Sequence, residues 1–317
     1  MRVLVTGSAG YIGSVAVPAL KLAGHTVVGY DLGWFGNDEQ STWWVKGDIR
    51  DPIIHPGWAD VVVHLAGISN DPMGELNPAL THEINRYGTI DFINHHVGKR
   101  HVVVSSCAVY GQSSELCTEE SKPNPQTTYA HAKADVDRWL GERAFNHAIL
   151  RLGTVFGPSP NHRLDLVVNR MVYDAMQGNG VTATGNAARP LTHIDDVASA
   201  IVWAVGNDAQ GIYNIVGENV RMKELAESVA ASVGVHARFR AGGADTRDYM
   251  ASGEKATRAG WSPTHSVAGS IRELAEFLTF AAEKGVVFNL TDNVRLSQLR
   301  RLIDGGVLDP NYLRYVA

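Results

Sequence analysis

The sequence has few of the features that would place it outside the ordinary globular proteins. It has only two cysteines, Cys107 and Cys117, in 317 residues, and Cys107 follows a very apolar run, so a disulfide framework is not expected. No run reaches the roughly 18 apolar residues that a membrane-spanning helix needs, and no signal peptide is visible. The net charge of −5 is too small to favour nucleic acid or an anionic membrane as a partner. We therefore expect a protein of the reducing cytoplasm.

Short runs rich in valine and isoleucine alternate with helical patterns through the first half of the chain. Six runs are apolar at both alternations, as strands buried on both faces of a parallel sheet are: 2–7, 25–31, 43–49, 60–67, 101–106 and 147–155. The helical patterns between them cover 11–23, 76–98 and 128–146. This order predicts an α/β fold with a Rossmann-like, doubly wound parallel sheet.

The second half of the chain is mostly helical. The segments with helical periodicity are 164–177, 194–205, 222–233 and 270–283, and a short strand pattern covers 213–216. We expect residues 1–157 to form a nucleotide-binding domain and 158–285 a smaller substrate lobe, with the helix near 195–205 belonging to either. Residues 286–317 form a polar, arginine-rich extension with weak helical periodicity at 295–303, and their sequence indicates no function.

A glycine-rich stretch, TGSAGYIG, lies between the first strand and the first helix. Gly7 permits a tight turn, and Gly10 lets the backbone approach a pyrophosphate. Gly13 allows close packing of the helix on the strand, and the helix N-terminus faces the phosphates. A turn that merely requires glycine would give the same pattern. The strand before it and the helix after it favour a dinucleotide-binding loop.

An acidic residue, Asp31, ends the second strand 18 positions after Gly13. A carboxylate at this place accepts hydrogen bonds from the adenosine ribose and repels a 2′-phosphate, so it predicts NAD rather than NADP. The stretch GDIRD follows the third strand and brings Asp48 and Ile49 to the adenine.

Two polar groups suggest hydride and proton transfer. Ser105 and Ser106 end the fifth strand, at the edge where open α/β sheets bind ligands. Tyr129 and Lys133 are four residues apart, so on a helix they share one face. A surface helix with a chance spacing is the alternative for this pair, and turn hydrogen bonds are the alternative for the serines. Taken together, the residues favour Tyr129 as a base whose pKa Lys133 and oxidised nicotinamide lower, with Ser106 orienting a substrate oxygen.

Several motifs together resemble the extended short-chain dehydrogenase/reductase family, in its nucleotide-sugar epimerase and dehydratase branch. The resemblance covers roughly residues 1–280, and its further motifs are HLAG (64–67), NRYGT (85–89), SSCAVYG (105–111), RLGTVFGP (151–158), RPLTHIDDVA (189–198), YNIVGE (213–218) and DYMASGEKATRAGW (248–261). The residues expected to contact NAD are Gly7, Ala9, Gly10, Tyr11, Ile12, Gly13, Asp31, Asp48, Ile49, Leu65, Ala66, Gly67, Asn85, Ser105, Tyr129 and Lys133.

The resemblance also implies a substrate and a partner. The residues expected to contact a nucleoside-diphosphate sugar are Ser106, Tyr129, Asn169, Arg189 and Arg247. Arg189 matches an arginine that holds the diphosphate, a task that suits a bidentate cation. Helices near 76–98 and 128–146 resemble those that pair two subunits, so a homodimer is implied.

Two departures from the family pattern bear on the reaction. Thr154 stands where an asparagine is usual. The 4,6-dehydratases carry an acidic pair directly after the catalytic serine or threonine, and this chain has Cys107 and Ala108 there. Because alanine cannot move a proton, dehydration is disfavoured. The remaining prediction is an NAD-dependent nucleotide-sugar epimerase, acting most simply at C4 by transient oxidation to a keto sugar.

Alternatives remain at the level of the sequence. One is a net oxidoreductase, either a 4-keto reductase or a sugar-nucleotide dehydrogenase. Another, of a different class, is a catalytically silent module that senses NAD. The 13 histidines form no cluster with metal-ligand spacing, so no metal is expected.

Overall fold

The large sheet is the centre of the fold and positions the candidate site. The computed structural model describes residues 1–317 except 37–40, 52–56, 144–145, 243–246, 312 and 316–317. The sheet has seven parallel strands. In spatial order these are β11 (Gly211–Ile215), β7 (His147–Leu152), β5 (Arg100–Ser106), β4 (Val61–His64), β1 (Arg2–Thr6), β2 (Thr26–Asp31) and β3 (Trp43–Lys46). The order reverses between β1 and β4, which is where a doubly wound sheet binds its ligand.

Helices cover both faces of the large sheet. On one face, α1 (Gly13–Leu22) and α7 (Ile194–Gly206) pack together over apolar residues of β1, β4, β5 and β7. The other face is covered by α2 (Asp71–Gly74), α3 (Pro78–His82), η1 (Glu83–Gly88), α4 (Thr89–His95) and α5 (Thr128–Gly141). The doubly wound α/β fold predicted from the strand and helix order is thereby confirmed.

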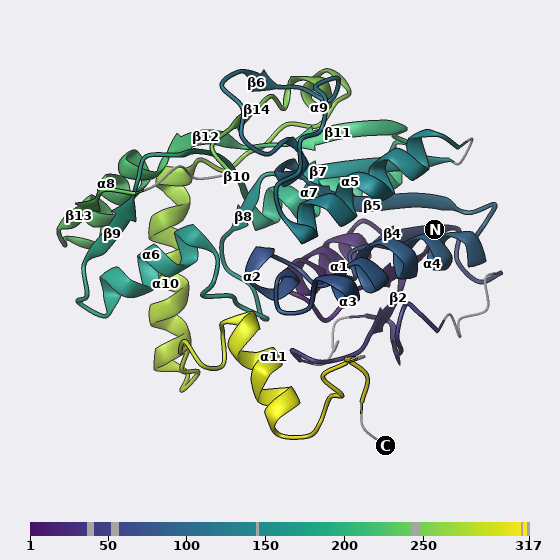
Figure 1. Ribbon diagram of the computed structural model, residues 1–317, viewed down its shortest axis with the longest axis horizontal. Helices are drawn as coiled ribbons and strands as arrows, with labels where there is room; N and C mark the ends of the chain where they lie inside the picture. The colour runs from purple at the N-terminus through teal and green to yellow at the C-terminus, as the bar shows by residue number, and fades with distance from the viewer. Residues whose placement is uncertain (37–40, 52–56, 144–145, 243–246, 312, 316–317) are drawn as a thin grey trace.

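A smaller lobe follows the first six strands of the large sheet and has its own apolar core. Figure 1 shows its helices α6, α8 and α10 together at one end of the molecule. Its helices are α6 (Val167–Met176), α8 (Met222–Val233), α9 (Glu254–Arg258) and α10 (Val267–Glu283). Its strands and the neighbouring short ones are β6 (Leu116–Cys117), β8 (Thr154–Phe156), β9 (Val181–Thr184), β10 (Ala188–His193), β12 (Glu218–Arg221), β13 (Ala237–Arg240) and β14 (Met250–Ala251). Leu191, Leu225 and Leu274 lie in this core.

The chain crosses between the two parts more than once. β11 and α7 fall within the range expected for the substrate lobe, yet β11 pairs with β7 at the edge of the large sheet and α7 packs on α1. The predicted helical stretch 76–98 is helical without a break from Pro78 to His95. It contains α3 and α4, and between them the π-helical turn η1. Among the described residues, no helix has both the length and the apolar character to span a membrane.

The C-terminal extension is helical where the sequence indicated weak periodicity. Helix α11 (Arg295–Asp304) is followed by a segment that runs back along the large sheet, and an antiparallel bridge joins Leu308 to Tyr315. Leu299, Leu308 and Leu313 are buried with Tyr30 and other residues on the α3–α4 side of the sheet. The extension is therefore part of the folded nucleotide-binding region.

Candidate nucleotide and active site

The loop after β1 is built for close backbone approach. Gly7 has φ +70°, and a Cβ there would lie 2.7 Å from the Ala66 nitrogen. A Cβ on Gly13 would lie 2.3 Å from the Gly7 carbonyl oxygen, so α1 begins against the turn with no room for a side chain. The N-cap residue of α1, Ile12, makes no side-chain cap and lines a pocket with Gly10 and Gly13, as a site for a pyrophosphate requires.

The carboxylate of Asp31 is held at the end of β2. It accepts hydrogen bonds from the backbone nitrogen of Ala9, at 3.1 Å, and of Gly33, at 2.7 Å. These contacts fix the side chain beside the glycine loop, in the position from which a carboxylate meets an adenosine ribose.

A single pocket joins these features. It is lined by eleven of the predicted cofactor residues: Gly7, Gly10, Tyr11, Ile12, Gly13, Asp31, Asp48, Ile49, Leu65, Ala66 and Gly67. Trp34, Phe35, Arg50, Arg163 and Arg295 also line it, and the sequence did not indicate any of them. The crowded glycines, the acidic residue at the end of β2 and the pocket between them fit a bound dinucleotide.

The side chain of Asn85 holds the loop after β4 in place. Its side chain accepts a hydrogen bond from the Ile68 nitrogen at 2.7 Å and donates one to the Ile68 oxygen at 2.8 Å. A Cβ on Gly67 would lie 2.8 Å from the Asn85 amide oxygen. In this structure Asn85 therefore supports the pocket wall through Gly67 and Ile68.

The predicted catalytic residues converge at the carboxyl end of β5. Ser106 caps the short helix η2 (Cys107–Tyr110), where its hydroxyl accepts a hydrogen bond from the Ala108 nitrogen at 3.1 Å, and it also hydrogen-bonds Tyr129. The Lys133 ammonium donates to the Val104 carbonyl at 2.8 Å. Helix α5 thus places the phenol beside the serine, and the lysine one turn further along is anchored on the same strand.

Ionisation at this site differs from the sequence expectation in one respect. Burial first, and then the nearby Asp71 carboxylate, raise the pKa of Tyr129 to about 12, although Arg163 and the hydrogen bond to Ser106 act in the opposite direction. Burial lowers the pKa of Lys133 to about 8. In the protein without cofactor the phenol is therefore protonated at neutral pH, and Lys133 is not among the groups with the largest effect on its pKa.

A buried ion pair lies behind Lys133. Asp137, one turn further along α5, accepts a hydrogen bond from Arg151 at 2.9 Å, and both side chains are almost fully buried. Arg151 also donates to the Tyr110 hydroxyl at 3.0 Å, and Tyr110 donates to Asn214 at 2.7 Å. The charge of Asp137 raises the pKa of Lys133 against the effect of burial. In the sequence, the four-residue spacing between Lys133 and Asp137 indicates that the two side chains lie on one face of a helix.

The predicted substrate residues differ in their burial and in the contacts that they make within the chain. Asn169 is fully buried and bonds to Gly157, Tyr11 and Arg163 of its own chain, at 3.0–3.2 Å. Arg189 is buried on β10. Arg247 forms an ion pair with Asp71 at 3.2 Å. Their contacts with a substrate stay predictions.

Three side chains with metal-ligand atoms meet at the start of α7. Donor atoms of His193, Asp195 and His265 lie within 4.8 Å of one another, which their separation in the sequence did not suggest. The two imidazole rings are stacked at 4.2 Å, and His265 is hydrogen-bonded to Asp196 at 3.0 Å. Because imidazole lone pairs lie in the ring plane, stacked rings direct them side by side and not toward one point. This geometry is poor for tetrahedral ligation.

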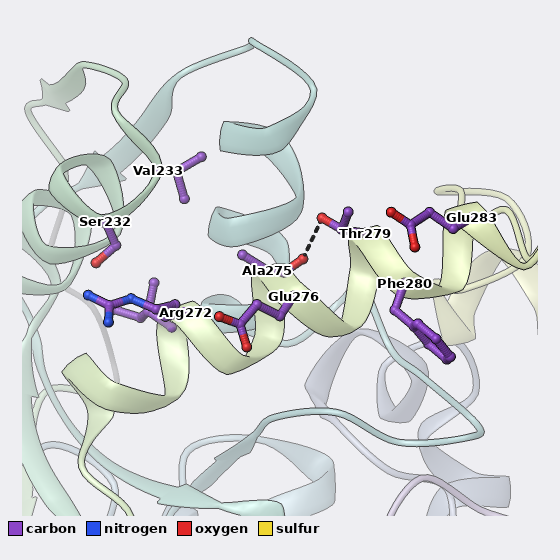
Figure 2. Close-up of a pocket in the computed structure, with 9 residues that line it drawn as sticks. Ser232, Val233, Arg272, Ala275, Glu276, Thr279, Phe280 and Glu283 are labelled. Carbon is purple, nitrogen blue, oxygen red and sulfur yellow. Dashed lines mark hydrogen bonds between the residues drawn. The ribbon is translucent and has the colours of Figure 1, made fainter.

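A second hollow lies on the outside of the smaller lobe. Figure 2 shows it between α8 and α10, with Arg272 and Glu276 at its edge and Thr279 bonded to the Ala275 carbonyl at 2.9 Å. None of the residues that line it was predicted to bind cofactor or substrate. The pocket at the switch point of the large sheet is thus the candidate site.

Known proteins resemble this chain along most of its length. Residues 3–216 match the NAD dependent epimerase/dehydratase family. UDP-glucose 4-epimerase of Mycolicibacterium smegmatis is 29% identical over 309 residues, covering 87% of this chain and 98% of that protein. UDP-glucuronic acid decarboxylase 1 of Xenopus tropicalis is 24% identical over 68% of this chain. The chain spans only 56% of that protein's length, and 61% of the corresponding protein of Danio rerio.

One solved structure resembles this chain in fold and contains NAD, the cofactor predicted from the sequence. The crystal structure of UDP-glucose 4-epimerase of Thermus thermophilus in complex with NAD superposes with a TM-score of 0.79 at 26% identity, covering 87% of this chain and 98% of that one.

Proposed function

The chain belongs to the NAD-dependent epimerase/dehydratase family and uses NAD as its cofactor, and on this basis we propose that it epimerises a nucleoside-diphosphate sugar, most simply at C4. The observation that carries the proposal is the convergence of Ser106, Tyr129 and Lys133 at the carboxyl end of β5. Two relatives are named for UDP-sugars, so UDP-hexoses come first among the candidate substrates.

Each residue of the set has a separate task. NAD, when bound, accepts a hydride and returns it. Tyr129 takes the proton of the sugar hydroxyl and later gives it back, and Ser106 holds that oxygen in line. Lys133, held on Val104, would bind the nicotinamide ribose, and the positive charge of oxidised nicotinamide would favour the anionic form of the phenol. Inversion would require the keto sugar to rotate in the pocket, so that its opposite face is presented to the reduced cofactor.

The residues after Ser106 disfavour the dehydratase reaction. Cys107 is fully buried, its thiol donates to the Arg151 carbonyl, and burial raises its pKa far above the ordinary range. Such a thiol is a packed residue and not an acid or base. Ala108 offers no proton either. Elimination of water needs an additional acid and base at this place, and epimerisation does not.

The test is interconversion without added cofactor. Purified protein should convert UDP-glucose and UDP-galactose into each other in either direction, followed by chromatography of the products. Because the hydride returns to the sugar, reduced nicotinamide should not accumulate. If no sugar nucleotide in a panel of UDP-, GDP-, CDP- and dTDP-sugars is interconverted, the proposal fails.

A net oxidoreductase is the second candidate, and the same assay separates it. A stoichiometric gain of reduced-nicotinamide absorbance would indicate net oxidation of the sugar nucleotide. A stoichiometric loss would indicate 4-keto reduction. Either result would replace the proposed epimerisation. Release of carbon dioxide from UDP-glucuronate would instead indicate the activity named for the Xenopus relative. The homodimer through the helices near 76–98 and 128–146 is proposed on the same family grounds, and light scattering would measure its mass.

A further inference from the structure

The C-terminal extension lies over the adenosine side of the nucleotide pocket. Figure 1 shows α11 and the following segment, in yellow, beside the first strands of the large sheet. The Tyr315 hydroxyl donates to the Leu32 carbonyl at 2.7 Å, and Leu32 lines the pocket. Arg314 pairs with Asp51, and the Lys46 ammonium lies 3.9 Å from the centre of the Tyr315 ring. The last described residues of the extension, as well as its helix, therefore contact the nucleotide-binding region.

One side chain of the extension enters the pocket lining. Arg295, the first residue of α11, is 3% exposed and stacks its guanidinium on the Phe35 ring at 4.2 Å. It donates to the Asn161 carbonyl at 3.2 Å and to Gln298 at 2.8 Å. The Asn161 amide in turn bonds to the Ala9 carbonyl, in the glycine loop. Arg295 is thus one residue removed from the backbone that faces a pyrophosphate.

The charge of Arg295 is not balanced by an ion pair. The neighbouring Arg163 is neutralised by Asp165 through two contacts of 2.9 Å. No described carboxylate forms an ion pair with Arg295. Burial and repulsion from Arg163 lower its pKa to about 9, and Asp165 and Asp31 oppose this. A buried guanidinium with no anionic partner is costly in free energy, and a bound anion would remove that cost.

We propose that Arg295 is a cofactor-binding residue of the C-terminal extension that donates hydrogen bonds to the pyrophosphate of NAD. The pyrophosphate supplies the missing negative charge, and arginine is suited to phosphate oxygens because its donors form a planar fork. The extension thereby closes the pocket with a cation as well as with apolar packing. This inference rests on the NAD site and not on the sugar-nucleotide reaction.

The experiment measures nucleotide affinity by calorimetry on full-length protein freed of bound nucleotide. Arg295→Gln should weaken binding of both NAD and ADP-ribose by about ten- to a hundredfold, the range for loss of a hydrogen bond to a charged group. Adenosine, which lacks the pyrophosphate, should lose less than about threefold. The salt dependence of ADP-ribose binding should become shallower, because one ionic contact is gone.

Two further variants keep the test decisive. Arg301→Gln is the matched control, because Arg301 lies on the same helix, is 59% exposed and pairs with Asp292 outside the pocket; its ADP-ribose affinity should stay that of the unaltered protein. Arg295→Lys keeps the charge and should retain the salt dependence with a smaller loss, which tests the idea even if Arg295→Gln does not fold. Unchanged ADP-ribose affinity in Arg295→Gln would overturn the proposal. Equal losses for adenosine and ADP-ribose in either variant would overturn it too.

Discussion

The groups around Tyr129 have opposite effects on the ionisation of its phenol. Asp71 and burial favour the neutral phenol, and the hydrogen bond to Ser106 favours the anion. Asp71 is itself fixed by Thr127, whose hydroxyl donates to it at 2.6 Å, and by Arg247. An arriving cofactor adds the positive charge of oxidised nicotinamide to this balance. A phenol that is neutral in the free protein is thus expected to become a base only when NAD is bound.

Removing the hydroxyl of Tyr129 tests its role directly. Tyr129→Phe should lower turnover of the sugar nucleotide by about 10²- to 10⁴-fold, the range for loss of a general acid–base group. NAD affinity, measured by calorimetry, should change by less than a fewfold because the ring and its packing remain. Full turnover in the variant would show that another group moves the proton. Rates in the unaltered protein should rise with pH until the phenol of the NAD complex is ionised, at a pKa below the value of about 12 of the free protein.

The elements of the first domain could be predicted because their sequence signals are local. A strand buried on both faces is apolar at successive positions, as in Val61, Val62 and Val63 of β4, and the glycine loop and Asp31 have fixed places relative to strands. The sequence left open whether the helix near 195–205, which is α7, belongs to the first domain, and the return of β11 to the large sheet could not be predicted because it depends on long-range pairing. Helical periodicity also does not reveal the π-helical turn η1 between α3 and α4. Leu299 of α11 belongs to the same apolar core as Tyr30 and Ile49, which are far from it along the chain.

Helix α11 should behave as part of the nucleotide-binding core. Leu299 is fully buried in it, against residues that also line the pocket. Leu299→Ala should lower the free energy of unfolding by ~2–5 kcal/mol, the range for a buried leucine, as measured by urea denaturation. Leu290→Ala, at a leucine 39% exposed, should change it by less than ~0.5 kcal/mol. A cost for Leu299→Ala no larger than that of the control would mean that α11 is not docked in solution.

Over the whole molecule, buried histidines are spread through both parts of the fold. His64 lies in the large sheet, between the hydroxyls of Thr6 and Thr89 at 3.0 Å each. Burial lowers the pKa of His64 to about 3, and that of His101, His162 and His193 to about 4. Between about pH 4 and pH 6.5, all four imidazoles are therefore neutral in the folded protein, whereas they are protonated in the unfolded chain.

The histidines should make the fold sensitive to mild acid. Unfolded histidines titrate near pKa ~6.5, so between about pH 6.5 and pH 4 the unfolded chain binds more protons than the folded one. Stability should fall as pH decreases through this window, by up to ~1.4 kcal/mol per pH unit for each histidine, and should not depend on histidine above about pH 7. Chemical denaturation across this range gives the number of protons taken up on unfolding. His64→Gln, which keeps groups for both threonine hydroxyls, should reduce that number by about one near pH 5. A stability that is constant from pH 7 to pH 4.5 would show that these imidazoles are solvated in the folded state, contrary to their burial.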